Sequence, residues 1–235
     1  NAAAHIGRHL LGFPNEPLRE LIARRSLFRD LAGRGRSAVY ANAYRCAYLD
    51  ALELRHEHAA LPEPPLPVRP ERIRPSASTC AVRAAGHAFR TFDHLRRGEA
   101  LYHDLTNEQP RAIGCEVPHR SPREAAEVFL ELGRAHDLAM FEYFRTDEAG
   151  HARDFEAADR ALAELDEFLR AMVEGLREGD GLLVASDHGN LEDLSMRQHT
   201  FARVPVLGFG TAAAVAGGIR SILEVHPALL ALAGA

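Results

Sequence analysis

Lysine is absent from the 235 residues, so all 28 side chains with a permanent positive charge are arginines. A coding sequence rich in G and C produces this bias, and so does selection for arginine ion pairs at high temperature. The residues alone do not separate these two causes. Within this sequence, only arginine guanidinium groups can offer a permanent positive charge to a ligand.

Cysteine is scarce and dispersed. Cys46, Cys80 and Cys115 lie far apart and form no C-x-x-C pair, which fits a reducing compartment with unreactive thiols. No run approaches the ~20 apolar residues that a membrane-spanning helix needs, and no basic-then-apolar leader is present. We therefore expect a cytoplasmic protein without a membrane partner.

Excess positive charge is also missing, because the formal net charge is −5. This balance gives no indication of nucleic-acid binding. Apolar residues make up 46% of the chain, which is enough to bury a sizeable core. The length allows one large domain, or a core with a small insertion.

Hydrophobic periodicity predicts an α/β protein, a mostly parallel sheet with helices on both faces. The expected strands are short apolar runs, at 37–42, 138–144, 181–185 and 204–209. The expected helices have apolar residues every three or four positions, at 17–33, 47–58, 78–97, 122–136, 155–176 and 219–233. The strongest start signal is at Ser121, which precedes Pro122 and has Glu124 three positions on.

The segment 61–118 differs in composition. It opens with six prolines between positions 61 and 75 and continues into a turn-rich stretch at 101–118. We expect a small cap-like insertion at 61–118 on a core formed by 1–60 and 119–235.

The richest motif follows the predicted strand 181–185. Asp187 and His188 come directly after it, and His199 lies twelve positions beyond the Asp. Neighbouring side chains point apart on a regular strand, but Gly189 frees the backbone to turn so that both can converge. A second pair, Asp147 and His151, follows the predicted strand 138–144.

Ligands collect beyond the carboxyl ends of parallel strands, so these two motifs are expected to share a site. The i, i+4 spacing of Asp147 and His151 fits one helical face, whereas Gly150 would also allow a tight turn. Each fragment alone has an ordinary explanation, a helix cap, a surface His or a hydrogen-bonded loop. Their conjunction favours a two-metal hydrolytic centre that uses Zn²⁺ or Mn²⁺, with Mg²⁺ as a further option.

The remaining histidines lack this context and are interpreted as surface or core residues. They are His5, His9, His56, His58, His87, His94, His103, His119, His136 and His226.

Four motifs together resemble the alkaline phosphatase superfamily, in the branch of cofactor-independent phosphoglycerate mutase and phosphopentomutase-like enzymes. They are Thr146-Asp147-Glu148-Ala149-Gly150-His151, Ser186-Asp187-His188-Gly189-Asn190-Leu191-Glu192, His199-Thr200 and Val204-Pro205-Val206. The resemblance implies that Asp147, His151 and His199 hold one ion, and that Asp187 and His188 hold the other. Asn190 and Glu192 would orient these ligands.

The same resemblance implies a Ser or Thr nucleophile upstream of Asn1, because residues 1–9 resemble the segment that follows it in the family. Two features depart from the mutases: the candidate insertion is small, and the lysine that they place near the phosphoryl group is absent. An arginine such as Arg45 or Arg153 would have to replace it.

We therefore expect a metal-dependent phosphatase or phosphomutase-like enzyme with a small phosphorylated substrate. A non-catalytic metal- or phosphate-binding relative, and a phosphodiesterase or sulfatase of the same superfamily, remain alternatives. The sequence does not indicate the oligomeric state.

Overall fold

The computed structural model describes residues 13–67 and 69–234. Its strands are β1 (Ala38–Tyr40), β2 (Ala43–Tyr44), β3 (Arg90–Thr91), β4 (Leu138–Met140), β5 (Gly181–Ala185) and β6 (Val206–Gly210). Its helices up to the middle of the chain are α2 (Glu16–Arg24), α3 (Leu27–Gly33), α4 (Cys46–Ala51), the 3₁₀ helix η1 (Pro70–Arg72), α5 (Ala77–Ala84), α6 (Phe92–Arg97) and α7 (Glu108–Ala112). The remaining helices are α8 (Pro122–Ala135), α9 (Arg145–Ala152), α10 (Phe155–Gly175), α11 (Ala213–Ala216) and α12 (Ile222–Gly234).

The predicted α/β class is confirmed, and the strands associate in pairs. β1 pairs with β4 and β2 pairs with β3, both in parallel. β5 and β6 are antiparallel, with Gly181 opposite Gly210 and Ala185 opposite Val206. The antiparallel pair differs from the expected parallel arrangement because the chain turns back through residues 186–205 without a crossover helix.

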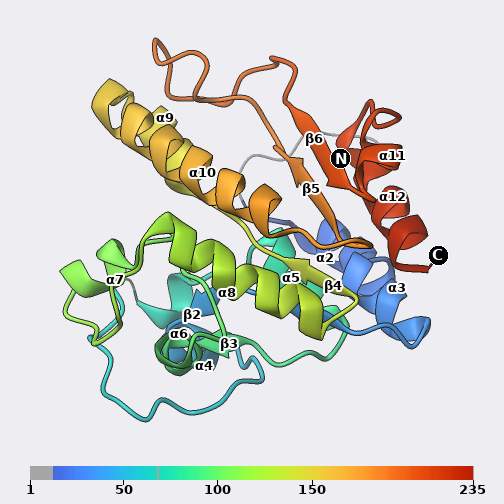
Figure 1. The fold of residues 1–235 in the computed structure, drawn as a ribbon. Coiled ribbons are helices and arrows are strands. Elements are labelled where there is room, and N and C mark those ends of the chain that lie inside the picture. Colours follow the sequence, from blue (N-terminus) through green and yellow to red (C-terminus); the bar gives the residue numbers. More distant parts are fainter. Residues whose placement is uncertain (1–12, 68, 235) are drawn as a thin grey trace.

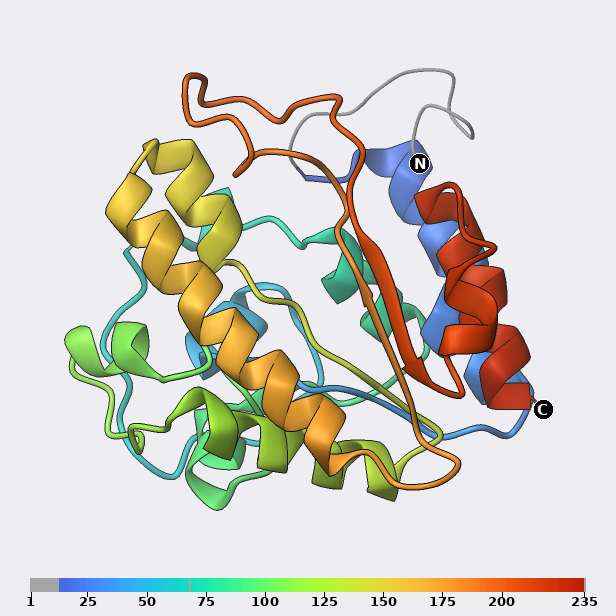
Figure 2. The same cartoon turned by 45° about the horizontal axis from the view of Figure 1, so that its top comes forward.

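Helices lie on both sides of the β5–β6 pair (Figures 1 and 2). The long helices α8 and α10 pack against each other on one side, whereas α2, α3, α11 and α12 gather on the other. Within the described residues, no helix is long and apolar enough to cross a membrane.

Local signals define α8 and α10 well. Ser121 and Glu124 form the expected capping box, in which the Ser121 hydroxyl accepts from the Glu124 amide and the Glu124 carboxylate accepts from the Ser121 amide. α10 starts at the Asp154 cap and buries Phe168 and Met172 against α8. The predictions for these two helices, and for β5, are confirmed.

Three predicted helices are too long. The expected helix 17–33 is interrupted at Ser26, whose hydroxyl caps α3 and also donates to the Ala81 carbonyl. The expected helix 47–58 stops at Ala51, and Glu53 then adopts a left-handed conformation with φ 52°.

The expected helix 78–97 is instead α5, β3 and α6. Gly86 turns the chain with φ 71°, and Arg90 and Thr91 pair with Ala43 and Tyr44 of β2. Pairing with a distant strand thus overrides the local helical periodicity in this segment.

Parts of the segment 61–118 pack with the core elements. Val82 of α5 lies in one hydrophobic cluster with Phe28 and Leu31 of α3. Leu101 and Leu105 lie in a second cluster with residues of α8 and α10. These two clusters contain most of the large buried apolar side chains. The division into a core and a cap-like insertion stays a prediction. The resemblance noted for residues 1–9 falls outside the described part of the chain.

Phe168 offers a direct test of the α8–α10 packing. Its ring is 4% exposed and lies 6.3 Å from Phe129 and 5.9 Å from Phe141, measured between ring centroids. We expect Phe168→Ala to lower the free energy of unfolding by about 3–5 kcal/mol in urea titrations, because a buried cavity remains. Leu162→Ala, at a 49% exposed position of the same helix, should cost about 0.5 kcal/mol or less. Equal costs for the two variants would contradict this packing.

Candidate metal centre

The first half of the site lies on α9, which follows β4. Asp147 and His151 are one turn apart on this helix, and Asp147 Oδ1 lies 3.4 Å from His151 Nε2. The helical alternative for this pair is therefore correct, and the tight turn is wrong. Both side chains are part-exposed at the carboxyl side of the sheet, where α9 begins at Arg145.

The second half lies on the long connection between β5 and β6. An isolated antiparallel bridge joins Gly189 to Thr200, and the Thr200 amide donates to the Gly189 carbonyl at 2.8 Å. This bridge places His199 beside His188, whose ring stacks on it with centroids 3.5 Å apart and 12° between the planes. Only glycine fits at position 189, because a Cβ there would collide with the Thr200 hydroxyl and the Glu192 carboxylate.

The two halves meet at the carboxylate of Asp147. Asp147 Oδ1 lies 3.4 Å from His199 Nε2 and 3.8 Å from His188 Nε2. The Nε2 atoms of His199 and His151 are 3.2 Å apart. Asp147, His188 and His199 each offer a ligand atom within 4.8 Å of the other two.

The tautomer of His151 indicates which kind of ligand this cluster fits. Its Nδ1 lies 2.6 Å from the carbonyl oxygen of Arg197, which only accepts, so Nδ1 carries the proton. In the neutral ring, Nε2 then presents a lone pair to Asp147 and His199. A lone pair beside a carboxylate oxygen is unfavourable unless a proton or a cation lies between them, and neutral imidazole with carboxylate is a donor set that fits a divalent metal.

Asn190 and Glu192 brace this group. Asn190 is 4% exposed and its Nδ2 donates to Asp147 Oδ1 at 2.8 Å. The Glu192 carboxylate accepts hydrogen bonds from the Asn190 backbone N–H at 2.8 Å and from the Thr200 hydroxyl. Asn190 thus contacts the ligand Asp147 directly, whereas Glu192 contacts Asn190 and Thr200, and the orienting role of both residues stays a prediction.

Asp187 lies at the margin of the group. Its side chain is 78% exposed, and Oδ2 is 3.5 Å from His188 Nε2. His188, expected beside Asp187 in one site, also stacks on His199, expected in the other. The five predicted ligands therefore lie in one continuous cluster, and their division between two ions stays a prediction.

Charge and burial favour neutral imidazole at His199. Its pKa lies below the ordinary value because of burial, and the neighbouring His188 and His151 lower it further, while Asp147 opposes the effect. A neutral imidazole is the form that binds metal.

A pocket of about 200 Å³ lies next to the start of α9, the helix that carries Asp147. It is lined by residues that include Asn42, Arg45, Tyr102, His103 and Phe144, and Phe144 is also the residue that precedes α9. The His103 ring stacks on Phe144 with centroids 5.0 Å apart. No motif marks His103, which was interpreted as a surface or core residue, so its place in this pocket could not be predicted from the residues around it.

The two candidate phosphate-binding arginines differ in position. Arg45 lines the pocket, and its guanidinium donates to the Pro64 carbonyl. Arg153 is exposed at the end of α9 in a left-handed conformation with φ 57°. Only Arg45 therefore lies where it can contact a molecule in the pocket.

Comparison with known proteins agrees with this geometry. A family model described as Metalloenzyme superfamily matches residues 110–229. Proteins named 2,3-bisphosphoglycerate-independent phosphoglycerate mutase are 36% identical over 127 residues in Desulforudis audaxviator and 36% identical over 126 residues in Agrobacterium fabrum. These matches cover 50% and 49% of this chain, and 25% of each relative.

A third protein of that name, from Cereibacter sphaeroides, is 32% identical over 146 residues, 58% of this chain and 28% of the relative. The chain thus spans about a quarter of the length of these curated relatives. No solved structure matches the chain.

A substitution at Gly150 tests whether the hydrogen bond from Asn190 positions the Asp147 carboxylate. A Cβ at position 150 would overlap the Asn190 side-chain amide and push it away from Asp147. We expect Gly150→Ala to weaken Zn²⁺ binding about 10- to 100-fold in calorimetric titrations, the usual loss when a group that orients a ligand is displaced.

Gly133→Ala is the matched control, because a Cβ there meets no atom within 4 Å on helix α8. This variant should keep the parent affinity and gain about 0.4–1 kcal/mol of stability. Parent-like Zn²⁺ affinity in Gly150→Ala would show that Asn190 does not position Asp147.

The lowered pKa of His103 predicts that the free energy of unfolding depends on pH. Burial, and then the charge of Arg145, lower the His103 pKa from 6.5 to about 4. In the unfolded chain His103 takes up a proton as the pH falls through 6.5, but the folded protein resists this until about pH 4. The stability contributed by the neutral ring is therefore complete above pH 6.5 and is lost between pH 6.5 and 4, at up to about 1.4 kcal/mol per pH unit.

Urea unfolding across this pH range, with a chelator present, measures the effect. His103→Gln should flatten the decline in the free energy of unfolding below pH 6.5. His119→Gln, at a 56% exposed side chain, should leave the slope of the parent protein unchanged. An identical slope in His103→Gln would rule out the neutral buried ring.

Proposed function

Because the chain belongs to the Metalloenzyme superfamily, we propose that the protein is a metal-dependent phosphoryl-transfer enzyme. The observation that carries this proposal is the meeting of three imidazole Nε2 atoms at one oxygen of Asp147, at 3.4 to 3.8 Å. The relatives named phosphoglycerate mutase support the choice of phosphoryl transfer.

We assign the ligands as the family resemblance implies. Asp147, His151 and His199 hold one ion, and Asp187 and His188 hold the other. Two divalent ions, Zn²⁺ or Mn²⁺, would coordinate the attacking and leaving oxygens of the phosphoryl transfer. They would also lower the pKa of a bound water or hydroxyl. By the same resemblance, we propose that a Ser or Thr serves as the nucleophile.

The chain's own groups prepare this site. The Arg197 carbonyl keeps the His151 proton on Nδ1, so that Nε2 is free to bind. Asn190 fixes one oxygen of Asp147 by donating to it. Both contacts hold the ligands in place before substrate arrives, which lowers the cost of ordering them.

The adjacent pocket suits a small phosphate ester. Arg45 supplies a guanidinium that can pair with phosphate oxygens, and Tyr44, Tyr48 and Tyr102 line the same pocket beside the remainder of the substrate. The family resemblance implies that phosphoglycerate mutases place a lysine near the phosphoryl group. This sequence contains no lysine. We therefore favour transfer to water, a phosphatase reaction, over transfer within a phosphoglycerate.

Asp187 provides the sharpest test, because its carboxylate is exposed and its loss should not unfold the chain. In the intact protein, Asp187→Asn should reduce metal-dependent hydrolysis of p-nitrophenyl phosphate at least ~100-fold, since one ion loses a charged ligand. The thermal unfolding temperature should stay close to that of the parent.

Asp193→Asn is the control on the same loop, because within the described chain its carboxylate is hydrogen-bonded to Ser195 and to no residue of the cluster. It should hydrolyse at the parent rate. Hydrolysis by Asp187→Asn at the parent rate would refute the ligand assignment. Faster turnover of a sulfate ester or phosphodiester by the parent would replace the phosphatase proposal with the corresponding activity.

A further inference from the structure

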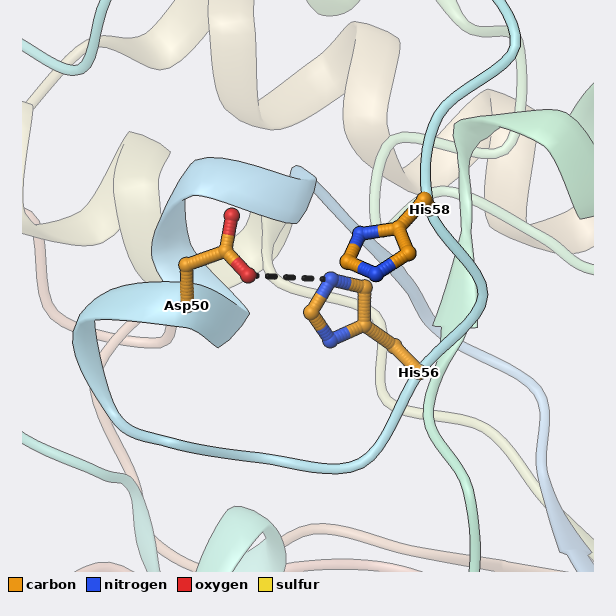
Figure 3. A group of neighbouring side chains, drawn as sticks. All are labelled: Asp50, His56 and His58. Atoms are coloured by element: carbon orange, nitrogen blue, oxygen red, sulfur yellow. Dashed lines mark ion pairs between the residues drawn. The ribbon is translucent and has the colours of Figure 1, made fainter.

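A second group of metal-binding side chains lies away from α9, at the end of α4. Asp50 sits in the last turn of this helix, and His56 and His58 follow on the segment that leaves it (Figure 3). Each of the three offers a ligand atom within 4.8 Å of the other two. The group shares no residue with the Asp147 cluster.

The backbone holds this segment in place. The left-handed Glu53 turns the chain, and the Leu54 amide donates to the Leu49 carbonyl at 2.9 Å. His56 then forms a parallel bridge with Phe89, whose amide donates to the Arg55 carbonyl at 2.8 Å. Along an extended segment, residues two apart project to the same side, which brings His56 and His58 together.

His56 is the most informative member of the group. Its side chain is only 5% exposed, and Nδ1 lies 2.7 Å from the Leu54 carbonyl oxygen, to which it must donate. Nε2 is buried and makes no hydrogen bond within the described chain. It points at Asp50 Oδ1, 3.3 Å away (Figure 3).

In the neutral ring, this geometry sets an imidazole lone pair against a carboxylate oxygen. A buried acceptor without a donor is costly, and a carboxylate beside it adds repulsion. A cation between the two atoms removes both problems. A backbone carbonyl that fixes the far nitrogen is also the usual way in which a metal-binding imidazole is oriented.

We propose that Asp50, His56 and His58 form a further divalent-cation site, of the kind that binds Zn²⁺. Two imidazoles and one carboxylate are a common zinc set, and they leave a fourth position for water or an exogenous ligand. An ion there ties the segment 54–58 to the end of α4.

Glu57, between the two histidines, is not a member of this site. Its carboxylate lies 3.2 Å from Arg97 and 3.7 Å from His94, on another part of the surface. The ring centroids of His56 and His58 are 5.7 Å apart, which is close enough for both imidazoles to bind one ion.

The rival explanation is a proton in place of the metal. A protonated His56 would pair with Asp50 and leave no part for His58. The two explanations therefore differ in whether substitution of His58, an exposed residue, changes zinc binding.

The test starts from a His151→Ala/His188→Ala/His199→Ala protein, which lacks all three imidazoles of the first cluster, so its outcome does not depend on the proposed enzyme activity. Zn²⁺ is titrated in competition with a chromogenic chelator. We expect one ion per chain to bind, and we expect His58→Ala and Asp50→Ala to weaken that ion more than about 100-fold, beyond the loss typical of groups that only orient a ligand.

His119→Ala, at an exposed histidine elsewhere, is the control and should bind the ion at full affinity. Both test positions are exposed, so neither change is expected to unfold the chain. Addition of Zn²⁺ should also shift the ¹⁵N resonance of His56 Nε2 in the starting protein but not in His58→Ala. Absence of the ion from the starting protein, or equal affinity after His58→Ala, would overturn the proposal.

Discussion

The carboxylate of Asp147 is the point on which the site depends. One of its oxygens accepts from Asn190 at 2.8 Å and faces the Nε2 atoms of His151, His188 and His199 at 3.4 to 3.8 Å. Without a cation or a shared proton, the Nε2 lone pair of His151 and this carboxylate would repel each other. The fold keeps them together, which is the expected property of a metal centre.

The surrounding elements serve this convergence. α9 carries Asp147 and His151 on one face, and the antiparallel return of β6 along β5 brings the end of the loop back over its beginning. The close bridge between Gly189 and Thr200 then stacks His199 on His188. Two local constraints, glycine at positions 150 and 189, make room for Asn190 and for Thr200.

Local signals in the sequence predicted the parts of the fold that depend on neighbouring residues. α8 and α10 follow from caps and apolar spacing, and β5 follows from an apolar run, so all three are confirmed. The predicted helix 78–97 is wrong because Arg90 and Thr91 pair with β2, 47 positions earlier, and local periodicity carries no information about such a partner.

The same distinction applies to the sites. The motifs around Asp147 and Asp187 could be found because each follows an apolar run, and the structure brings their side chains together. His56, His58 and His103 were interpreted as surface or core residues, and no motif marked Asp50. Their placement depends on the turn at Glu53, the bridge to Phe89 and the stacking on Phe144, which are contacts of the folded chain rather than patterns in the sequence.

The most direct measurement is anomalous X-ray diffraction from crystals of the intact protein grown with Zn²⁺ or Mn²⁺, recorded at the absorption edge of the metal. The account predicts a strong anomalous peak at coordination distance, about 2.0–2.2 Å, from an Asp147 oxygen and from Nε2 of His151 and His199. A fully metal-loaded crystal with no peak at Asp147, its three imidazoles hydrogen-bonded to protein or water instead, would contradict it.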